Sequence, residues 1–171
     1  GKNIYRTITL GDSFTFGMYV NTNENYPEQL EDLLNQNCKS SKFEVINLGV
    51  YGYDIQYSVR RFQVRGQKYD PNLVLWFLKN DDFAELQEII HPRIEYYKDE
   101  LKKVGVYDSL LMQGRYAPDY DEAMKELSNK YSREQILNLQ KKFLLELGSS
   151  FRGRLLIFTF KSTDNKYKLV M

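Results

Sequence analysis

The sequence is poor in two residue types that carry much of enzyme chemistry: it has one histidine, His91, and one cysteine, Cys38, among 171 residues. A single cysteine excludes a disulfide within the chain and says little about the redox compartment. An excess of one charge is also absent, since 24 basic and 23 acidic residues leave a formal net charge of +1. This balance gives no electrostatic footprint for nucleic acid or an anionic membrane, so neither is an expected partner.

Long apolar runs are missing too. No run approaches the ~20 residues that a membrane-spanning helix requires, and no signal-peptide pattern opens the chain. We therefore expect no membrane segment within these residues. The chain begins with Gly1 rather than methionine, as a trimmed or processed chain does, and its localisation stays unknown.

Strand patterns alternate with helix patterns along the chain. We expect strands over residues 4–10, 43–48, 73–78 and 155–160, and helices over residues 26–34, 54–67 and 132–147. Strands that alternate with helices predict a parallel sheet with right-handed crossovers, in the α/β class. The length favours a single domain over residues 1–171, with a tyrosine-rich insertion at about 88–131.

Two helix starts carry explicit signals. Asp54 is a suitable N-cap for the second helix. Ser132 and Gln135 have the spacing of a capping box, which opens the third helix. The apolar face expected of that helix consists of Ile136, Leu139, Phe143, Leu144 and Leu147.

The turn after the first strand contains the strongest candidate for a catalytic residue. Gly11, Asp12 and Ser13 follow the strand, and Gly17 closes the turn four residues after the serine. Ligands of open α/β sheets bind at the carboxyl ends of strands, where this turn lies. The alternative is that Ser13 only caps the following loop; the flanking glycines favour a nucleophile.

Gly52 and Asn80 follow the second and third strands, and their chemistry complements a serine. Acyl transfer needs a nucleophile and preorganised donors for the oxyanion of the tetrahedral intermediate. The backbone N–H groups of Ser13 and Gly52 and the side-chain amide of Asn80 would supply three donors. Asn80 is also of a type that caps helices, which is the structural alternative for this residue.

These residues resemble the SGNH/GDSL hydrolase family. Its first block matches Gly11-Asp12-Ser13 with Gly17, and its second, an asparagine with a glycine five positions later, matches Asn47 and Gly52. The third block, Gly-x-Asn-Asp, appears as Leu78-Lys79-Asn80-Asp81, with leucine in place of glycine.

The resemblance implies a flavodoxin-like fold, a three-layer α/β/α sandwich around a central parallel sheet. It also implies ester hydrolysis through an acyl-serine, of the esterase, lipase or carbohydrate deacetylase class. The implied substrate is a small-molecule or carbohydrate acyl ester, and no cofactor or metal is expected. Some members of the family follow an amino-terminal membrane anchor, which would make an extracytoplasmic location consistent with the resemblance.

The fourth block of the family, Asp-x-x-His, supplies the general base, and nothing after Phe160 matches it. The last residues contain Asp164 but no histidine. By comparison with the family, we expect the chain to lack the last strand and helix of the domain. Such a chain is expected to be inactive or weakly active.

His91 is the only candidate for a base within the sequence. It could be a base displaced to a position after the third strand, or a surface or capping histidine near the start of the insertion. A base needs hydrogen-bond reach to Ser13, which sequence spacing does not establish. We expect that His91 is not the base.

Three other functions stay open. A degenerate or truncated domain would fold and bind without turnover, and an O-acyltransferase would pass the acyl group to a sugar hydroxyl instead of water. Asp12, Asp81 and Asp82 could instead form a phosphoacceptor or Mg²⁺ site, although this leaves Ser13 unexplained.

The fourth strand is expected at an edge of the sheet. An exposed edge strand tends to pair with another chain. We expect this edge to be covered by the insertion or by a second copy of the chain, which makes a homo-oligomer one of the possible assemblies.

Overall fold

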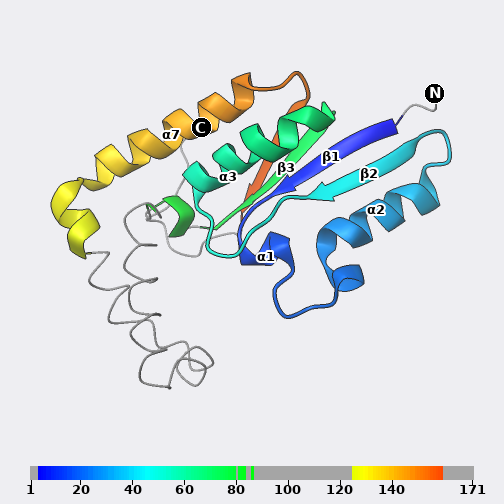
Figure 1. Cartoon of the computed structure of the whole chain (residues 1–171), viewed down its shortest axis with the longest axis horizontal. Helices are drawn as coiled ribbons and strands as arrows, with labels where there is room; N and C mark the ends of the chain where they lie inside the picture. The colour runs from blue at the N-terminus through cyan, green and yellow to red at the C-terminus, as the bar shows by residue number, and fades with distance from the viewer. Residues whose placement is uncertain (1–3, 80, 84–85, 87–124, 160–171) are drawn as a thin grey trace.

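The computed structural model describes residues 4–79, 81–83, 86 and 125–159 (Figure 1). The predicted insertion at about 88–131 lies almost entirely outside these residues. The described part of the chain holds a sheet of four parallel strands: β1 (Ile4–Leu10), β2 (Lys42–Asn47), β3 (Leu73–Leu78) and β4 (Arg154–Thr159). Their order in the sheet is β2-β1-β3-β4.

The four predicted strands are confirmed, with shifts of one residue in β2 and β4. The order of the strands is that of a flavodoxin-like sheet, in which the chain winds outward from β1 in both directions. The α/β class and the parallel sheet expected from the sequence are therefore confirmed.

Helices cover both faces of the sheet, as Figure 1 shows. On one face α2 (Tyr26–Asn37) packs beside β2. On the other face α3 (Ile55–Arg61) packs against α7 (Arg133–Ser149). The main apolar core lies between the sheet and this helix pair, and its fully buried side chains include Ile8, Leu10, Val74, Trp76, Ile55, Val59, Phe62 and Leu147.

The predicted helix starts are confirmed at the level of single hydrogen bonds. The Asp54 carboxylate accepts from the N–H of Tyr57, 2.9 Å away. Ser132 and Gln135 form both bonds of the capping box that opens α7. Asn25 caps α2 in the same way, by accepting from the N–H of Glu28.

The helix predicted over residues 54–67 is confirmed in its extent, but its second half is not α-helical. The α-helical pattern ends at Arg61 and continues as a π-helical turn, η2 (Phe62–Gly66), and a 3₁₀ turn, η3 (Gln67–Tyr69). The wide turn packs the buried ring of Phe62 against Gly66, where a β-carbon would lie 2.6 Å from the ring. A larger residue at position 66 would therefore displace the Phe62 ring.

The two outer edges of the sheet differ in what covers them. At the β2 edge, the Asn35 side chain of α2 donates to the carbonyl of Phe43 and accepts from its N–H, at 2.9 and 3.0 Å. The Glu31 carboxylate accepts from the N–H of Val45 at 2.6 Å. Side chains of α2 therefore occupy three backbone groups on the outer edge of β2, the N–H and carbonyl of Phe43 and the N–H of Val45.

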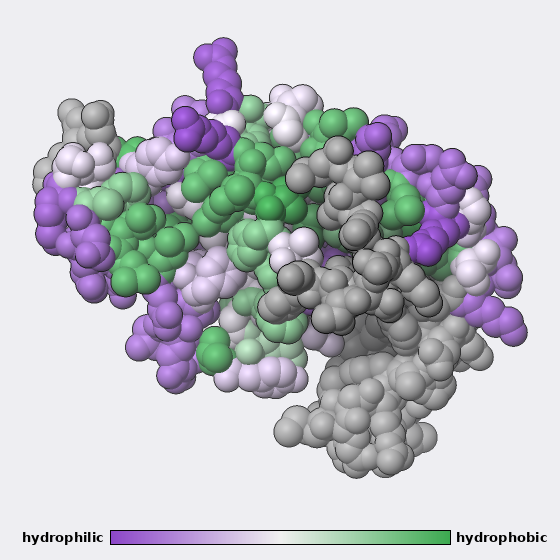
Figure 2. All heavy atoms as spheres, turned by 180° about the vertical axis from the view of Figure 1, so that it is seen from behind, coloured by the Kyte–Doolittle hydropathy of each residue, from purple (hydrophilic) through white to green (hydrophobic). Residues whose placement is uncertain are grey.

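At the opposite edge, β4 has three partly exposed apolar side chains, Leu156, Ile157 and Phe158. Side chains alternate between the two faces of a strand. Leu155 packs against the main core, so Leu156 and Phe158 belong to the other face of the sheet. Apolar side chains gather on the side of the molecule that Figure 1 hides (Figure 2).

Candidate active site

The turn that bears Ser13 is tightly built. The four-residue helix α1 (Ser13–Phe16) begins directly after the turn that follows β1 (Figure 1). Gly11 has a φ of +149°, and a β-carbon there would lie 2.8 Å from the carbonyl oxygen of Phe77. Gly17 adopts the left-handed conformation and donates to the carbonyl of Ser13. Both glycines that the sequence singled out are therefore required by the local backbone.

Asn47, at the end of β2, fastens the second motif to this turn. Its amide nitrogen donates to the carbonyl of Thr15 at 2.8 Å, and its amide oxygen accepts from the N–H of Gly49 at 2.9 Å. Gly49 packs so closely that a β-carbon would lie 2.5 Å from the backbone nitrogen of Phe16. The loop after β2 is therefore held directly on α1.

Gly52 belongs to this fastened loop. It is exposed, has a φ of +73°, and a β-carbon there would meet nothing within 4 Å. Within the described part of the chain, the backbone N–H groups of Ser13 and Gly52 have no hydrogen-bond acceptor. Nothing in the described part of the chain competes for these two donors, and the surroundings of Gly52 are open.

Asn80 and His91 lie outside the described residues, so the structure does not test their predicted roles. The residues on either side of Asn80 are nevertheless linked. The backbone N–H of Lys79 donates to the carboxylate of Asp82 at 2.8 Å. Asp82 belongs to the 3₁₀ turn η4 (Asp81–Phe83), and its carbonyl accepts from the buried side chain of Gln140 on α7.

Lys79 also contacts the first motif. Its ammonium nitrogen lies 3.0 Å from Oδ2 of Asp12, whose side chain is only 6% exposed. The other carboxylate oxygen, Oδ1, accepts from the N–H of Phe14. Neither the contact of Lys79 nor the structural role of Asn47 was predicted from the sequence. The only signal in the sequence was that a side chain able to form hydrogen bonds stands at the end of β2 and directly after β3.

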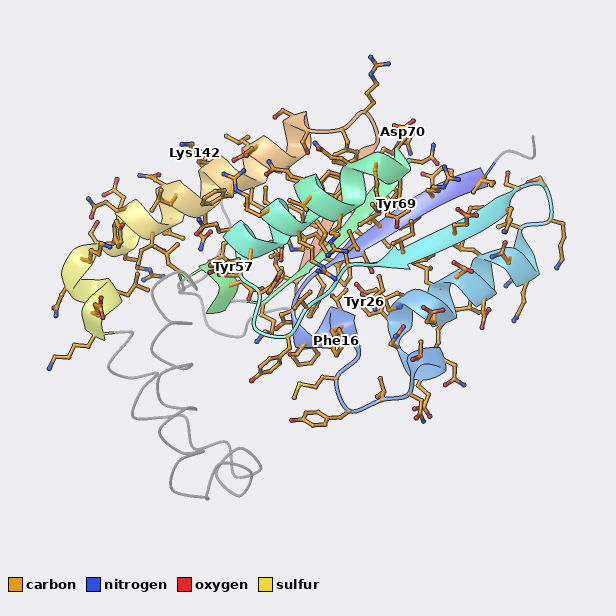
Figure 3. The ribbon with its side chains drawn as sticks, viewed as in Figure 1. Phe16, Tyr26, Tyr57, Tyr69, Asp70 and Lys142 are labelled. Carbon is orange, nitrogen blue, oxygen red and sulfur yellow. The ribbon has the colours of Figure 1, made fainter. Side chains whose placement is uncertain are left out.

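Tyr26 supports the turn from the first residue of α2. Its hydroxyl lies 3.2 Å from that of Thr15, which donates to the carbonyl of Leu10. The side chain of Tyr26 lies near α1 in Figure 3, and its ring packs edge-on against Phe158 of β4. Burial raises the pKa of the Tyr26 hydroxyl, partly opposed by its hydrogen bond to Thr15.

The surroundings of Ser13 are apolar and partly exposed. Phe14 and Phe16 on α1 are 55% and 54% exposed, and Tyr51 beside Gly52 is 57% exposed. The ring of Phe14 packs against that of Phe77 at a centroid distance of 5.9 Å. No side chain in the described ranges hydrogen-bonds the Ser13 hydroxyl.

Two of the three carboxylates considered for a metal site, Asp12 and Asp82, have other partners. Both oxygens of Asp12 are engaged, by Phe14 and Lys79, and Asp82 accepts from the backbone of Lys79. Residues 4–79, 81–83, 86 and 125–159 hold no group of three or more side chains suited to a metal ion. The same residues contain no helix long and apolar enough to cross a membrane.

The fold and the site define an α/β protein with a serine held at the carboxyl end of its first strand. No protein-family model matches the chain, and no curated protein matches it. Among solved structures, it is similar to AlinE4, described as an SGNH-hydrolase family esterase. The identity is 20%, the TM-score is 0.42, and the match covers 77% of this chain and 74% of that chain.

Two further structures are similar to this chain. A protein described as lipolytic and of the G-D-S-L family, from Desulfitobacterium hafniense DCB-2, is 20% identical. Its TM-score is 0.40, over 96% of this chain and 84% of that one. TesA is 12% identical with a TM-score of 0.42, over 85% of this chain and 97% of that one. The descriptions of AlinE4 and the G-D-S-L protein name the family that the sequence motifs resemble.

Proposed function

We propose that Ser13 is the nucleophile of a serine ester hydrolase site of the SGNH/GDSL type, which acts through an acyl-serine. The observation that supports this proposal most strongly is the contact between the Gly-Asp-Ser turn and the loop that follows β2. Asn47 and Gly49 hold the loop of Gly52 against the helix that begins with Ser13.

The chemistry follows from this arrangement. The hydroxyl oxygen of Ser13 attacks the ester carbonyl and displaces the alcohol, which leaves the acyl group on the serine; water then releases the acid. The backbone N–H groups of Ser13 and Gly52 support the proposal because they have no acceptor among the described residues. Asn80 would add its side-chain amide as the third donor to the oxyanion.

The substrate we propose is a small-molecule or carbohydrate acyl ester. Phe14, Phe16 and Tyr51 present half-exposed rings around the serine. Such rings can contact an acyl chain or the apolar face of a sugar. A substrate of this class needs no charge complementarity, in agreement with the near-neutral chain.

A second function, binding without turnover, is favoured by one observation. Within the described residues, no side chain hydrogen-bonds the Ser13 hydroxyl. In well-studied serine proteases, removal of one triad member lowers the rate by roughly 10⁴ to 10⁶. We therefore expect slow reaction at Ser13 and weak or absent turnover of esters by this chain.

A fluorophosphonate probe tests the site directly. We expect mass spectrometry to find the adduct on Ser13, and Ser13→Ala to abolish it. Ser128, an exposed serine whose hydroxyl donates to the carbonyl of Lys125, provides the matched control. Equal labelling of Ser13 and Ser128 would refute the nucleophile. Labelling of Ser13 as fast as that of an intact serine hydrolase would refute the non-catalytic alternative.

A further inference from the structure

A buried charge lies immediately before the proposed nucleophile. The side chain of Asp12 is 6% exposed, and an ionised carboxylate in such a place is costly unless it is paired and hydrogen-bonded. Its Oδ1 accepts from the N–H of Phe14 at 3.0 Å. Its Oδ2 lies 3.0 Å from the ammonium nitrogen of Lys79. Asp12 therefore connects the backbone of α1 to a cation at the end of β3.

Lys79 is itself held in place. Its side chain is 25% exposed, and its ammonium lies 5.8 Å from the ring centroid of Phe14, within the range of a cation–π contact. Its backbone N–H donates to Asp82, whose carbonyl accepts from Gln140. A series of polar contacts thus runs from α7 through the end of β3 to Asp12.

We propose that Lys79 is a positioning residue for Ser13. Its ammonium holds Asp12, and Asp12 holds the N–H of Phe14 and with it the first turn of α1. Asn80 follows Lys79 directly in the chain, so one dipeptide carries both the partner of the nucleophile turn and the proposed oxyanion donor. The catalytic part of this inference rests on the function proposed for Ser13.

A lysine beside a serine could instead accept the proton of the hydroxyl, as in serine–lysine dyads. The ion pair with Asp12 opposes that role, because an ammonium paired with a carboxylate is charged and cannot accept a proton. An arginine can hold a carboxylate but does not act as a base. Lys79→Arg therefore separates the two roles.

The test compares Lys79→Met and Lys79→Arg with the wild-type chain by two measurements. The hydrogen-exchange rate of the Phe14 amide reports how often its hydrogen bond to Asp12 opens, and it can be measured whether or not Ser13 reacts. We expect Lys79→Met to speed this exchange about tenfold and Lys79→Arg to restore it. Fluorophosphonate labelling is resolved into probe binding and the rate of the covalent step. We expect Lys79→Met to slow that step by about ten- to a hundredfold, with probe binding little changed.

Lys42→Met is the matched control, since the ammonium of Lys42 pairs with Glu44 at 3.5 Å on the exposed opposite end of the sheet. It should change neither measurement. Asp12→Asn keeps an acceptor for Phe14 and removes the charge. If Lys79 acts through Asp12, adding Lys79→Met to Asp12→Asn causes little further loss. If Lys79→Met alone folds poorly, the double variant, which has no unpaired carboxylate at position 12, is compared with Asp12→Asn alone, and a large further loss of Phe14 protection would overturn the inference.

Three results would overturn the inference. The first is unchanged Phe14 exchange in Lys79→Met, the second is additive losses in the cycle with Asp12→Asn, and the third is an equal loss of labelling in Lys79→Arg and Lys79→Met. If wild-type Ser13 takes no label, the proposed function fails. The amide exchange then decides the positioning role alone.

Discussion

Asn47 offers the most direct test of how the site is assembled. Replacement by alanine removes the bond to the carbonyl of Thr15 and the bond from the N–H of Gly49, at 2.8 and 2.9 Å. Each hydrogen bond contributes about 0.5–1.5 kcal/mol to stability, and a buried donor or acceptor that is left without a hydrogen-bond partner costs about 1–3 kcal/mol. We expect Asn47→Ala to lower the free energy of unfolding by about 2–4 kcal/mol.

Urea denaturation measures this loss, and thermal unfolding gives an independent value. For a chain of this length, 1 kcal/mol corresponds to roughly 2–4 °C, so the midpoint should fall by roughly 4–16 °C. Labelling of Ser13 should fall as well, because the loop of Gly52 is no longer fastened to α1.

Asn37→Ala is the matched control. The amide of Asn37 donates to the carbonyl of Leu33 at 2.8 Å, within an exposed part of α2. Exposed substitutions away from such links usually change stability by less than about 0.5 kcal/mol. Equal losses in Asn47→Ala and Asn37→Ala would refute the argument that Asn47 joins the two motifs.

Three shorter predictions concern other positions. In urea denaturation, Gly49→Ala should destabilise the chain, because a β-carbon at position 49 would clash with α1. Gly148→Ala should stabilise the chain by about 0.5–1 kcal/mol, because Gly148 lies on α7 with open space around it. The reverse order of the two stabilities would contradict the packing. Because burial raises the pKa of Tyr26 in the folded state, stability should fall as the pH rises above about 10, where the unfolded chain ionises first. Tyr26→Phe should remove this loss of stability at high pH. If the loss persists in a pH series of the variant, another group causes it. His91→Ala should leave fluorophosphonate labelling of Ser13 unchanged in a folded protein; a loss would make His91 the base.

Much of the fold could be predicted because local signals determine it. The run at residues 73–78 is apolar throughout and follows Asp70-Pro71-Asn72, so both the type and the bounds of β3 were clear. Asp54 and Ser132 act on backbone groups within three residues of themselves, so their capping roles could be deduced from spacing alone.

The parts that could not be predicted depend on contacts between distant segments. The bond between Asn47 and Thr15 spans 32 positions, and the pair of Lys79 with Asp12 joins the ends of two strands. The π-helical turn Phe62–Gly66 is a different case, because it is local: apolar spacing predicts a helix there but does not distinguish an α-helical from a π-helical pattern over five residues. The tight turn of Ser13 could be predicted from Gly11 and Gly17. The residues that hold this turn, Asn47 and Lys79, could not be predicted, and the catalytic role of Ser13 stays a prediction.

The unequal edges of the sheet limit how copies of this chain could assemble. Asn35 and Glu31 occupy the outer backbone groups of β2, so that edge cannot accept a strand without displacing α2. Among the described strands, a second copy that extends the sheet at β4 can offer only its own β4, which pairs the two copies about a two-fold axis. This pairing uses the β4 edge of both copies and therefore gives a closed dimer. A sheet that could pair at both edges would allow a fibre. Asn35 and Glu31 of α2 would then limit the number of copies in the assembly to two, although they lie at the edge opposite the contact between the copies.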